Sequence, residues 1–94
     1  MKKYLVEFCK VRHLFKKHLP LNVVKKLQIW AKKVEMIGLE ETRKIKGLHD
    51  EPLKGDRVGQ RSIRLNNAYR AIYEIHEDDT IVIIDVVEVN KHEY

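Results

Sequence analysis

The stretch from Pro52 to Ile75, PLKGDRVGQRSIRLNNAYRAIYEI, decides the fold because it contains a complete hairpin. Residues 61–65 and 69–75 each alternate between apolar and polar side chains, which is typical of half-buried strands. Asn66 and Asn67 lie between the two runs, and asparagine tolerates the left-handed backbone angles of tight turns. We therefore predict two antiparallel strands joined by a turn at residues 66–68.

The predicted hairpin has one apolar and one polar face. The alternation places Ile63 and Leu65 on one face, and Ser62, Arg64 and Asn66 on the other. The preceding loop, residues 53–59, contains two glycines that permit backbone angles a side chain would disfavour. Five cationic residues fall within seventeen positions: Lys54, Arg57, Arg61, Arg64 and Arg70. This density of positive charge on a loop and a strand face predicts a polyanionic ligand.

Hydrophobic patterning outside the hairpin predicts an α+β domain. The main helix has an apolar stripe with steps of four, three, four and three residues: Val23, Leu27, Trp30, Val34 and Ile37. We expect Asn22 to cap its start and Gly38 to end it, with Trp30 in the core. Shorter helical segments are predicted at residues 11–17 and 39–45, and strands at 4–9 and 80–89.

The nearly continuous apolar run at residues 80–89 predicts a strand covered on both faces. The order β-α-α-β-β-β then gives a small, mainly antiparallel sheet with helices on one face. At 94 residues the chain forms one domain, residues 1–94. Met1-Lys2-Lys3 leads directly into the first strand and no apolar run is long enough to span a bilayer, so we expect a cytoplasmic protein without a membrane segment.

Charge is distributed unevenly along the chain. Residues 1–42 carry 10 basic and 4 acidic side chains, residues 43–70 carry 8 and 3, and residues 71–94 carry 1 and 7. Lysines on helices commonly serve solubility, whereas arginines on an exposed strand face suit an anionic ligand. A basic body with an acidic final third therefore favours binding of an anionic ligand on one side.

Several kinds of chemical site are excluded or disfavoured by the motifs. The Gly55-x-x-x-Gly59 loop lacks the Lys-Ser/Thr of a nucleotide-binding loop, and no Cys/His cluster has zinc spacing. Asp85 and Glu88 are three apart on a strand, which predicts opposite faces and a poor metal pair. The lone Cys9 is interpreted as a buried structural thiol. We expect no cofactor and no metal.

Cations, histidines and a tyrosine remain as candidates for chemistry. Metal-independent RNA cleavage needs a base for the ribose 2′-OH, an acid for the leaving 5′-oxygen and cations for the charge on phosphorus. If the last strand pairs beside the hairpin, its end brings His92 and Tyr94 near Arg64 or Arg70. The alternative is that His49, His92 and Tyr94 are ordinary surface residues.

The motifs LHDEPLKGDR, SIRLNNAYR and the terminal HEY resemble the RelE/ParE superfamily of bacterial toxins over essentially the whole chain, most closely its HigB-like branch. The resemblance implies a ribosome-dependent mRNA endonuclease, the toxin of a type II toxin–antitoxin system. By match to the family's motifs, the catalytic positions are His49, Lys54, Arg64, Arg70, His92 and Tyr94. Arg57, Arg61 and Lys91 are the predicted RNA contacts.

The resemblance also implies partners: the ribosome, mRNA and a cognate antitoxin, expected to be a HigA-like helix-turn-helix protein through which the complex reaches operator DNA. Asp50-Glu51 separates His49 from Pro52, whereas some HigB-like proteins run from the histidine directly into Pro-Leu-Lys. Two alternatives stay open at this point. One is a ParE-like inhibitor of DNA gyrase on the same fold, and the other is a non-catalytic RNA-binding module.

Overall fold

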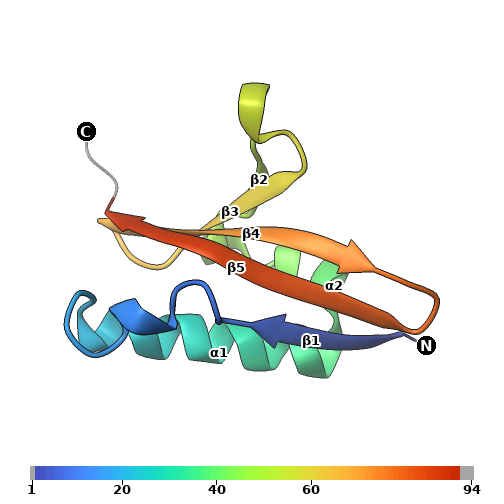
Figure 1. Ribbon diagram of the computed structural model, residues 1–94, viewed down its shortest axis with the longest axis horizontal. Coiled ribbons are helices and arrows are strands. Elements are labelled where there is room, and N and C mark those ends of the chain that lie inside the picture. Colours follow the sequence, from blue (N-terminus) through green and yellow to red (C-terminus); the bar gives the residue numbers. More distant parts are fainter. Residues whose placement is uncertain (1, 92–94) are drawn as a thin grey trace.

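A single mixed sheet organises the computed structural model, which describes residues 2–91 (Figure 1). Within these residues the strands are β1 (Lys3–Glu7), β2 (Glu51–Pro52), β3 (Gln60–Arg64), β4 (Tyr69–Glu77) and β5 (Ile81–Lys91). Their order in the sheet is β1-β5-β4-β3-β2. β1 runs parallel to β5, and the other neighbours are antiparallel. The predicted α+β class and mainly antiparallel sheet are confirmed.

Two helices lie on one face of this sheet, α1 (Leu21–Ile37) and α2 (Leu39–Arg43) (Figure 1). α1 buries the predicted apolar stripe except at its last position, since Ile37 is 52% exposed. Trp30 is buried as predicted, and its ring centroid lies 5.3 Å from that of Tyr73 on β4. The core therefore sits between α1 and one face of the sheet, and no helix of the described residues 2–91 covers the other face.

The ends of α1 confirm one prediction and correct another. The helix begins at Leu21, so Pro20 occupies the N-cap position without a side-chain hydrogen bond, and the predicted Asn22 cap is wrong. Gly38 ends the helix with a φ of 86°. A side chain there would also be crowded, because an added Cβ would lie 3.3 Å from the Tyr4 ring. The helix predicted at 11–17 is only a 3-10 turn, η1 (Arg12–Leu14).

β5 differs from its sequence-based prediction because the helices of the described chain, α1 and α2, both lie on one face of the sheet. Val82, Ile84 and Val86 are buried, whereas Ile83 and Val87 between and after them are only partly buried. A β-bulge then shifts the register, since Tyr73 pairs with Val86 but Ile72 pairs with Glu88. The extra residue reverses the alternation. Asp85 and Glu88 consequently share the open face, and their predicted placement on opposite faces is wrong.

The first strand is shorter than predicted. β1 ends at Glu7, and Cys9 lies beyond it with its side chain exposed. The interpretation of Cys9 as a buried thiol is therefore wrong. In residues 2–91, no helix combines the length and the hydrophobicity needed to cross a membrane.

Candidate functional site

Arg64 and Arg70 form the centre of the candidate site. They are directly opposite each other in the β3–β4 register, on the face away from the helices. Ile63 and Leu65 point to the core, so the predicted division of the hairpin into two faces is confirmed. The hairpin turn forms where predicted, but not through left-handed angles, since Asn66 and Asn67 are not among the described residues with positive φ.

The turn is instead closed by a side chain. The Asn66 carboxamide oxygen accepts hydrogen bonds from the backbone N–H groups of Ala68 at 2.7 Å and Tyr69 at 2.8 Å. This is an Asx-type turn, in which a side chain replaces a backbone acceptor. It fixes the hairpin register and with it the arginine pair.

His49 lies against both arginines. Its Nε2 atom is 3.4 Å from Nη1 of Arg64, and its carbonyl oxygen accepts a hydrogen bond from Nη2 of Arg70 at 3.3 Å. The same Arg70 nitrogen donates to the Ser62 hydroxyl at 2.7 Å. His49 is the one described non-glycine residue with positive φ, at 45°. Such conformations are rare and concentrate at functional sites.

Asp50, which follows His49 in the chain, is anchored to the central strands through its side chain. Its carboxylate is fully buried and accepts hydrogen bonds from Nε of Arg61 at 2.6 Å and from the Tyr73 hydroxyl at 2.5 Å. Burial raises the pKa of Tyr73 far above its ordinary value, and the hydrogen bond to Asp50 adds to the effect. Burial lowers the pKa of Arg61, but the hydrogen bond and charge of Asp50 outweigh it and raise that pKa overall. This network ties the segment before β2 to the central strands.

The network also places Arg61 away from the arginine pair. Arg61 shares the helix-side face of β3 with Ile63, and its side chain is 17% exposed. It lines a hollow between α2 and the sheet together with Arg43 and Asp50. Arg61, a predicted RNA contact, therefore lies on the opposite face of the sheet from Arg64.

A projecting loop between β2 and β3 carries Lys54 and Arg57, with the 3-10 turn η3 (Gly55–Arg57) at its tip (Figure 1). Gly55 and Gly59 have φ values of 66° and 98°, which confirms why glycine occupies both positions. Lys54 is exposed, and within residues 2–91 its side chain makes no hydrogen bond or ion pair. Lys54 is therefore available to a ligand, but it makes no hydrogen bond to His49, Arg64 or Arg70.

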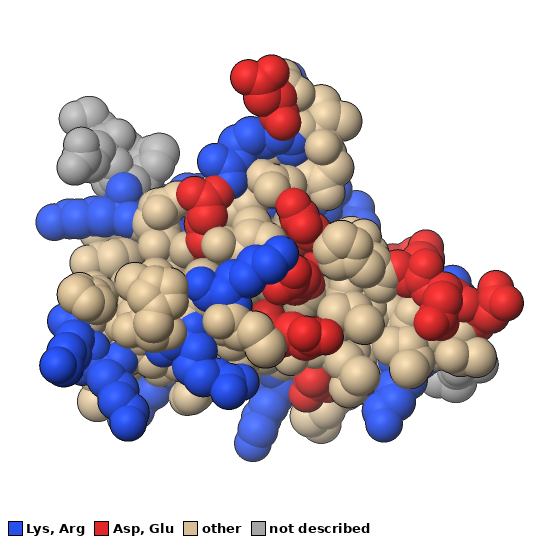
Figure 2. All heavy atoms as spheres, viewed as in Figure 1, with Lys and Arg blue, Asp and Glu red and all other residues tan. Residues whose placement is uncertain are grey.

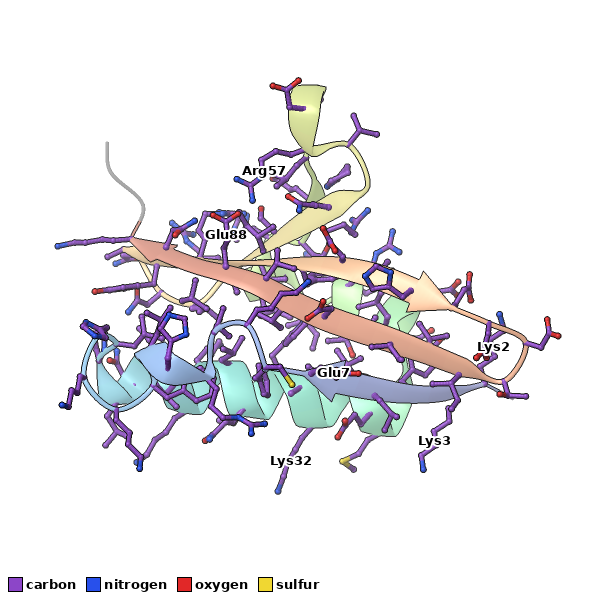
Figure 3. The ribbon with its side chains drawn as sticks, in the orientation of Figure 1. Lys2, Lys3, Glu7, Lys32, Arg57 and Glu88 are labelled. Carbon is purple, nitrogen blue, oxygen red and sulfur yellow. The ribbon has the colours of Figure 1, made fainter. Side chains whose placement is uncertain are left out.

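The loop is tied to the open face of the sheet by Arg57. Its guanidinium forms an ion pair with Glu88 of β5, and Figure 3 shows the two side chains one above the other. Arg57 Nε also donates to the Gln60 side chain at 2.8 Å, and Gln60 donates to Glu74 at 2.8 Å. The pairing gives Arg57 a loop-anchoring contact in addition to its predicted RNA contact.

The end of β5 lies beside the arginine pair, because β5 pairs with β4 of the hairpin. Asn90 is opposite Arg70 and Lys91 is opposite Tyr69 in the register of β4 and β5. Lys91 is exposed at this end. His92 and Tyr94, the remaining predicted catalytic residues, lie outside the described residues.

The open face is not uniformly basic. Glu7, Asp85 and Glu74 are register neighbours on β1, β5 and β4, and acidic side chains gather over the middle of the face in Figure 2. Lys10 forms an ion pair with Asp85 at 2.8 Å. Glu74, His76 and Asp85 bring their ligand atoms within 4.8 Å of one another, but Lys10 and Gln60 already engage both carboxylates. Positive charge is therefore concentrated at the hairpin end.

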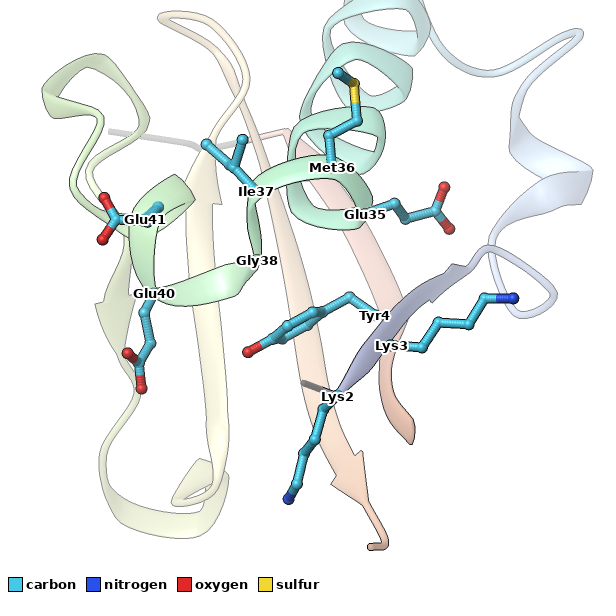
Figure 4. Close-up of a pocket in the computed structure, with 9 residues that line it drawn as sticks. All are labelled: Lys2, Lys3, Tyr4, Glu35, Met36, Ile37, Gly38, Glu40 and Glu41. Atoms are coloured by element: carbon cyan, nitrogen blue, oxygen red, sulfur yellow. The ribbon is translucent and has the colours of Figure 1, made fainter. Parts of the chain in front are cut away.

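A pocket of about 370 Å³ lies elsewhere, beside β1 and the end of α1 (Figure 4). The Tyr4 ring forms its floor beneath Gly38, and Met36 and Ile37 line it together with charged side chains. Among residues 2–91, no predicted site residue lines this pocket, so the described part of the arginine site does not extend into it.

Sequence reasoning missed Asp50, Ser62 and Tyr73. Asp50 was noted only as part of a two-residue separation between His49 and Pro52. The signal available in the sequence was the acidic side chain of Asp50 next to the candidate site residue His49. The following predicted strand contains Arg61, a possible partner for this carboxylate. Which arginine it binds depends on the β2–β3 register, Glu51 opposite Ser62 and Pro52 opposite Arg61.

Comparison with solved structures defines the fold class. The chain superposes on the YoeB/ParE toxin from Agrobacterium tumefaciens with a TM-score of 0.67 and 20% identity, covering 97% of this chain and 99% of that one. The toxin–antitoxin complex RelBE2 from Mycobacterium tuberculosis gives 0.61 and 21%, covering 96% and 99%. The YoeB dimer from Staphylococcus aureus gives 0.57 and 21%, covering 99% and 98%.

No protein-family model and no curated relative matches the sequence. The solved structures show that the chain has the RelE/ParE toxin fold, as the resemblance implied. The closer resemblance to the HigB-like branch stays a prediction.

Proposed function

We propose that this chain is the toxin of a type II toxin–antitoxin pair and cleaves mRNA on the translating ribosome. The observation that carries the proposal is the convergence of Arg64, Arg70 and His49 on the open face of a RelE/ParE fold. Two guanidinium groups facing each other across a hairpin repel unless an anion lies between or above them. A backbone phosphate, whose two non-bridging oxygens share the negative charge, is an anion of the required charge and shape.

Arg70 is the proposed stabiliser of the transition state. Its Nη2 atom is held by Ser62 and by the His49 carbonyl, which orients the guanidinium before substrate binds. Arginine has five N–H donors, and within residues 2–91 the Nη1 and Nε groups of Arg70 make no hydrogen bond, which leaves them for phosphate oxygens. Preorganised donors of this kind stabilise negative charge on phosphorus without further rearrangement. Arg64 positions the same phosphate.

The proposed reaction transfers two protons. A base removes the proton of a ribose 2′-OH, the resulting oxygen attacks the adjacent phosphorus, and the P–O5′ bond breaks as an acid protonates the leaving oxygen. His49, Lys54, His92 and Tyr94 are the proposed acid and base candidates. Both steps use side chains alone, so we propose that the chemistry needs no metal.

The proposed RNA path follows the positive end of the open face. Arg57 and Lys91 flank the arginine pair on the loop and on the end of β5. An RNA contact of Arg61 also stays a prediction, but it would use the helix-side face, where Asp50 already binds the guanidinium. We place the protein in the cytoplasm, where ribosomes and mRNA are found.

A toxin of this kind needs an inhibitor in its own host. We propose a cognate antitoxin of the helix-turn-helix class that presents acidic and apolar side chains and reaches operator DNA as a complex. Two solved structures with this fold are toxin–antitoxin complexes, RelBE2 and DinJ-YafQ. Complementary charge would make association fast and salt-dependent.

Induced expression in bacterial cells tests the proposal. The parent chain is expected to arrest growth and to leave transcript ends in phase with codons. Arg70→Ala should restore growth while remaining folded, and Lys44→Ala, an exposed cation on the far side, should arrest growth like the parent. An Arg70→Ala variant as toxic as the parent removes Arg70 from the mechanism.

The same experiment separates the alternative functions. DNA damage with intact transcripts would indicate a gyrase inhibitor. Absence of growth arrest would indicate an RNA-binding module without catalysis.

A further inference from the structure

The outward face of α1 carries large apolar side chains that do not belong to the core. Leu21 is 68% exposed, Ile29 54% and Met36 80%. They are separated by eight and seven residues, close to two helical turns each. Exposed apolar side chains aligned on one helix face are typical of a binding surface, because a partner that covers them removes them from water.

Lysines share this face. Two of them, Lys25 and Lys32, fall between the apolar residues, so that positions 21, 25, 29, 32 and 36 lie within an arc of roughly 80° at about 100° per residue. These five residues are named the α1 stripe, which is roughly 22 Å long at 1.5 Å per residue. Figure 3 shows Lys32 projecting from α1 away from the sheet.

No acidic residue balances these lysines along α1 except near its end. The helix sequence LNVVKKLQIWAKKVEMI contains four lysines and one glutamate. That glutamate, Glu35, turns toward the sheet edge, where its carboxylate accepts a hydrogen bond from the Val6 N–H at 3.0 Å. The α1 stripe is therefore apolar and positive, and its complement is apolar and negative.

Concave surfaces lie at the side and at one end of the stripe. A hollow of about 70 Å³ between α1 and the 3-10 turn η2 (Lys46–Leu48) is lined by Lys26, Ile29, Trp30, Lys33, Ile45 and Leu48. The apolar lining suits an apolar side chain of a partner. The ammonium groups of Lys26 and Lys33 beside it suit a neighbouring acidic side chain of that partner. At the other end, Met36 belongs both to the stripe and to the pocket of Figure 4.

We propose that the α1 stripe is the docking site for the antitoxin, and that the docked segment is an acidic amphipathic helix. The inference rests on the proposed function, which supplies the partner. The segment should carry apolar side chains at intervals of seven or eight residues, flanked by Asp or Glu. RNA fits less well, because exposed Leu, Ile and Met side chains offer no contact to phosphate, whereas Met is enriched at protein interfaces.

The position of the stripe determines how the antitoxin inhibits. α1 covers the face of the sheet opposite Arg64 and Arg70 (Figure 1). The docked helix therefore leaves the arginine pair exposed to solvent. We infer that the antitoxin inhibits without covering Arg64 and Arg70, so the complex can still bind a phosphate on its arginine face.

Calorimetric titration with the protein encoded by the adjacent small reading frame tests this docking site. Ile29→Ser and Met36→Ser should each weaken binding roughly tenfold or more, as truncation of interface anchors does. Lys32→Glu should mainly slow association. Val58→Ser, which truncates another exposed apolar residue on the Lys54 loop, is the matched control and should bind like the parent. Arg64→Gln should also retain the parent affinity.

Other outcomes overturn the inference in distinguishable ways. Parent-like affinity of the stripe variants with weak binding of Arg64→Gln would place the partner over the arginine face. Loss of growth arrest by folded Ile29→Ser in the absence of the partner would assign the stripe to the ribosome. A neighbour that neither binds nor relieves arrest would reject the toxin–antitoxin function itself. Amide chemical-shift mapping on the parent chain, expected to change at residues 21–36 rather than 60–70, repeats the test without any substitution.

Discussion

Arg64 and Arg70 are directly opposite each other across the antiparallel pair β3–β4. Like charges at opposed positions destabilise a hairpin by a few tenths to about 1 kcal/mol. Hydrogen bonds to His49 and Ser62 orient the two groups but supply no negative charge. The repulsion between the two arginines is therefore expected to lower the stability of the free protein, and the proposed phosphate would relieve it.

Replacing Arg64 with glutamine should separate stability from activity. Arg64→Gln removes the repulsion and only a long contact to His49. We expect the free energy of unfolding to stay the same or to rise by up to about 1 kcal/mol, and growth arrest to be lost. Urea unfolding and induced expression measure the two effects. A loss of stability would show that the arginine pair has a structural role instead.

Asp50→Asn should be strongly destabilising. The substitution leaves the Arg61 guanidinium, only 17% exposed, without its carboxylate. Breaking a buried ion pair costs about 3 kcal/mol or more, which lowers Tm by more than about 10 °C in a domain of this size. Thermal unfolding checks this value. Lys44→Ala breaks the exposed pair with Glu41 and should stay within about 0.5 kcal/mol of the parent.

Tyr73 makes a pH-dependent contribution to stability. Burial, followed by the hydrogen bond to Asp50, raises the pKa of the phenol in the folded state. Its neutral form is thus favoured by folding, so the contribution is fully present below the ordinary pKa of about 10 and is lost as pH rises above it.

The consequence can be measured by comparing the parent chain with Tyr73→Phe. Above about pH 10 the parent should lose up to about 1.4 kcal/mol per pH unit more than the variant. Urea unfolding from about pH 8 to about pH 11 gives both curves. At neutral pH the variant should be about 1 kcal/mol less stable, because Asp50 loses one hydrogen bond. If the free energy of unfolding fell equally with pH in both proteins, Tyr73 would not be the source of the pH dependence.

Glu88→Gln should loosen the loop that carries Lys54. The Arg57–Glu88 ion pair ties this loop to β5, and both side chains are about two-fifths exposed. A pair of this exposure contributes less than about 1 kcal/mol, so amide hydrogen exchange at residues 53–59 should accelerate by up to about fivefold. Amides of β4 serve as the internal reference and should be unaffected. Equal acceleration in both segments would indicate global destabilisation instead of local release.

Patterns within single elements could be read from the sequence because they depend on local periodicity. Period-two alternation predicted the faces of Ile63 and Leu65, and the helical stripe predicted the burial of Trp30. The glycines at 38, 55 and 59 occupy positions with positive φ, which local steric arguments can anticipate. Arg64 and Arg70 stood out as cations of one hairpin, but their selection as catalytic positions came from the resemblance to the RelE/ParE motifs.

Only the tertiary structure decided which distant groups meet. One extra residue in β5 reversed the alternation and brought Glu88 to the face of Asp85, and no local pattern encodes where such a bulge falls. The buried carboxylate of Asp50 likewise depends on the register of β2 against β3 and on the depth of Tyr73 in the core. The sequence by itself determined four of the five described strands, the main helix and the presence of both arginines on one hairpin, but not the short strand β2. The tertiary structure determined the contacts that hold the site in place, such as those of Asp50 with Arg61 and Tyr73. Buried charges are stabilised by partners that come together only when strands pair and helices pack.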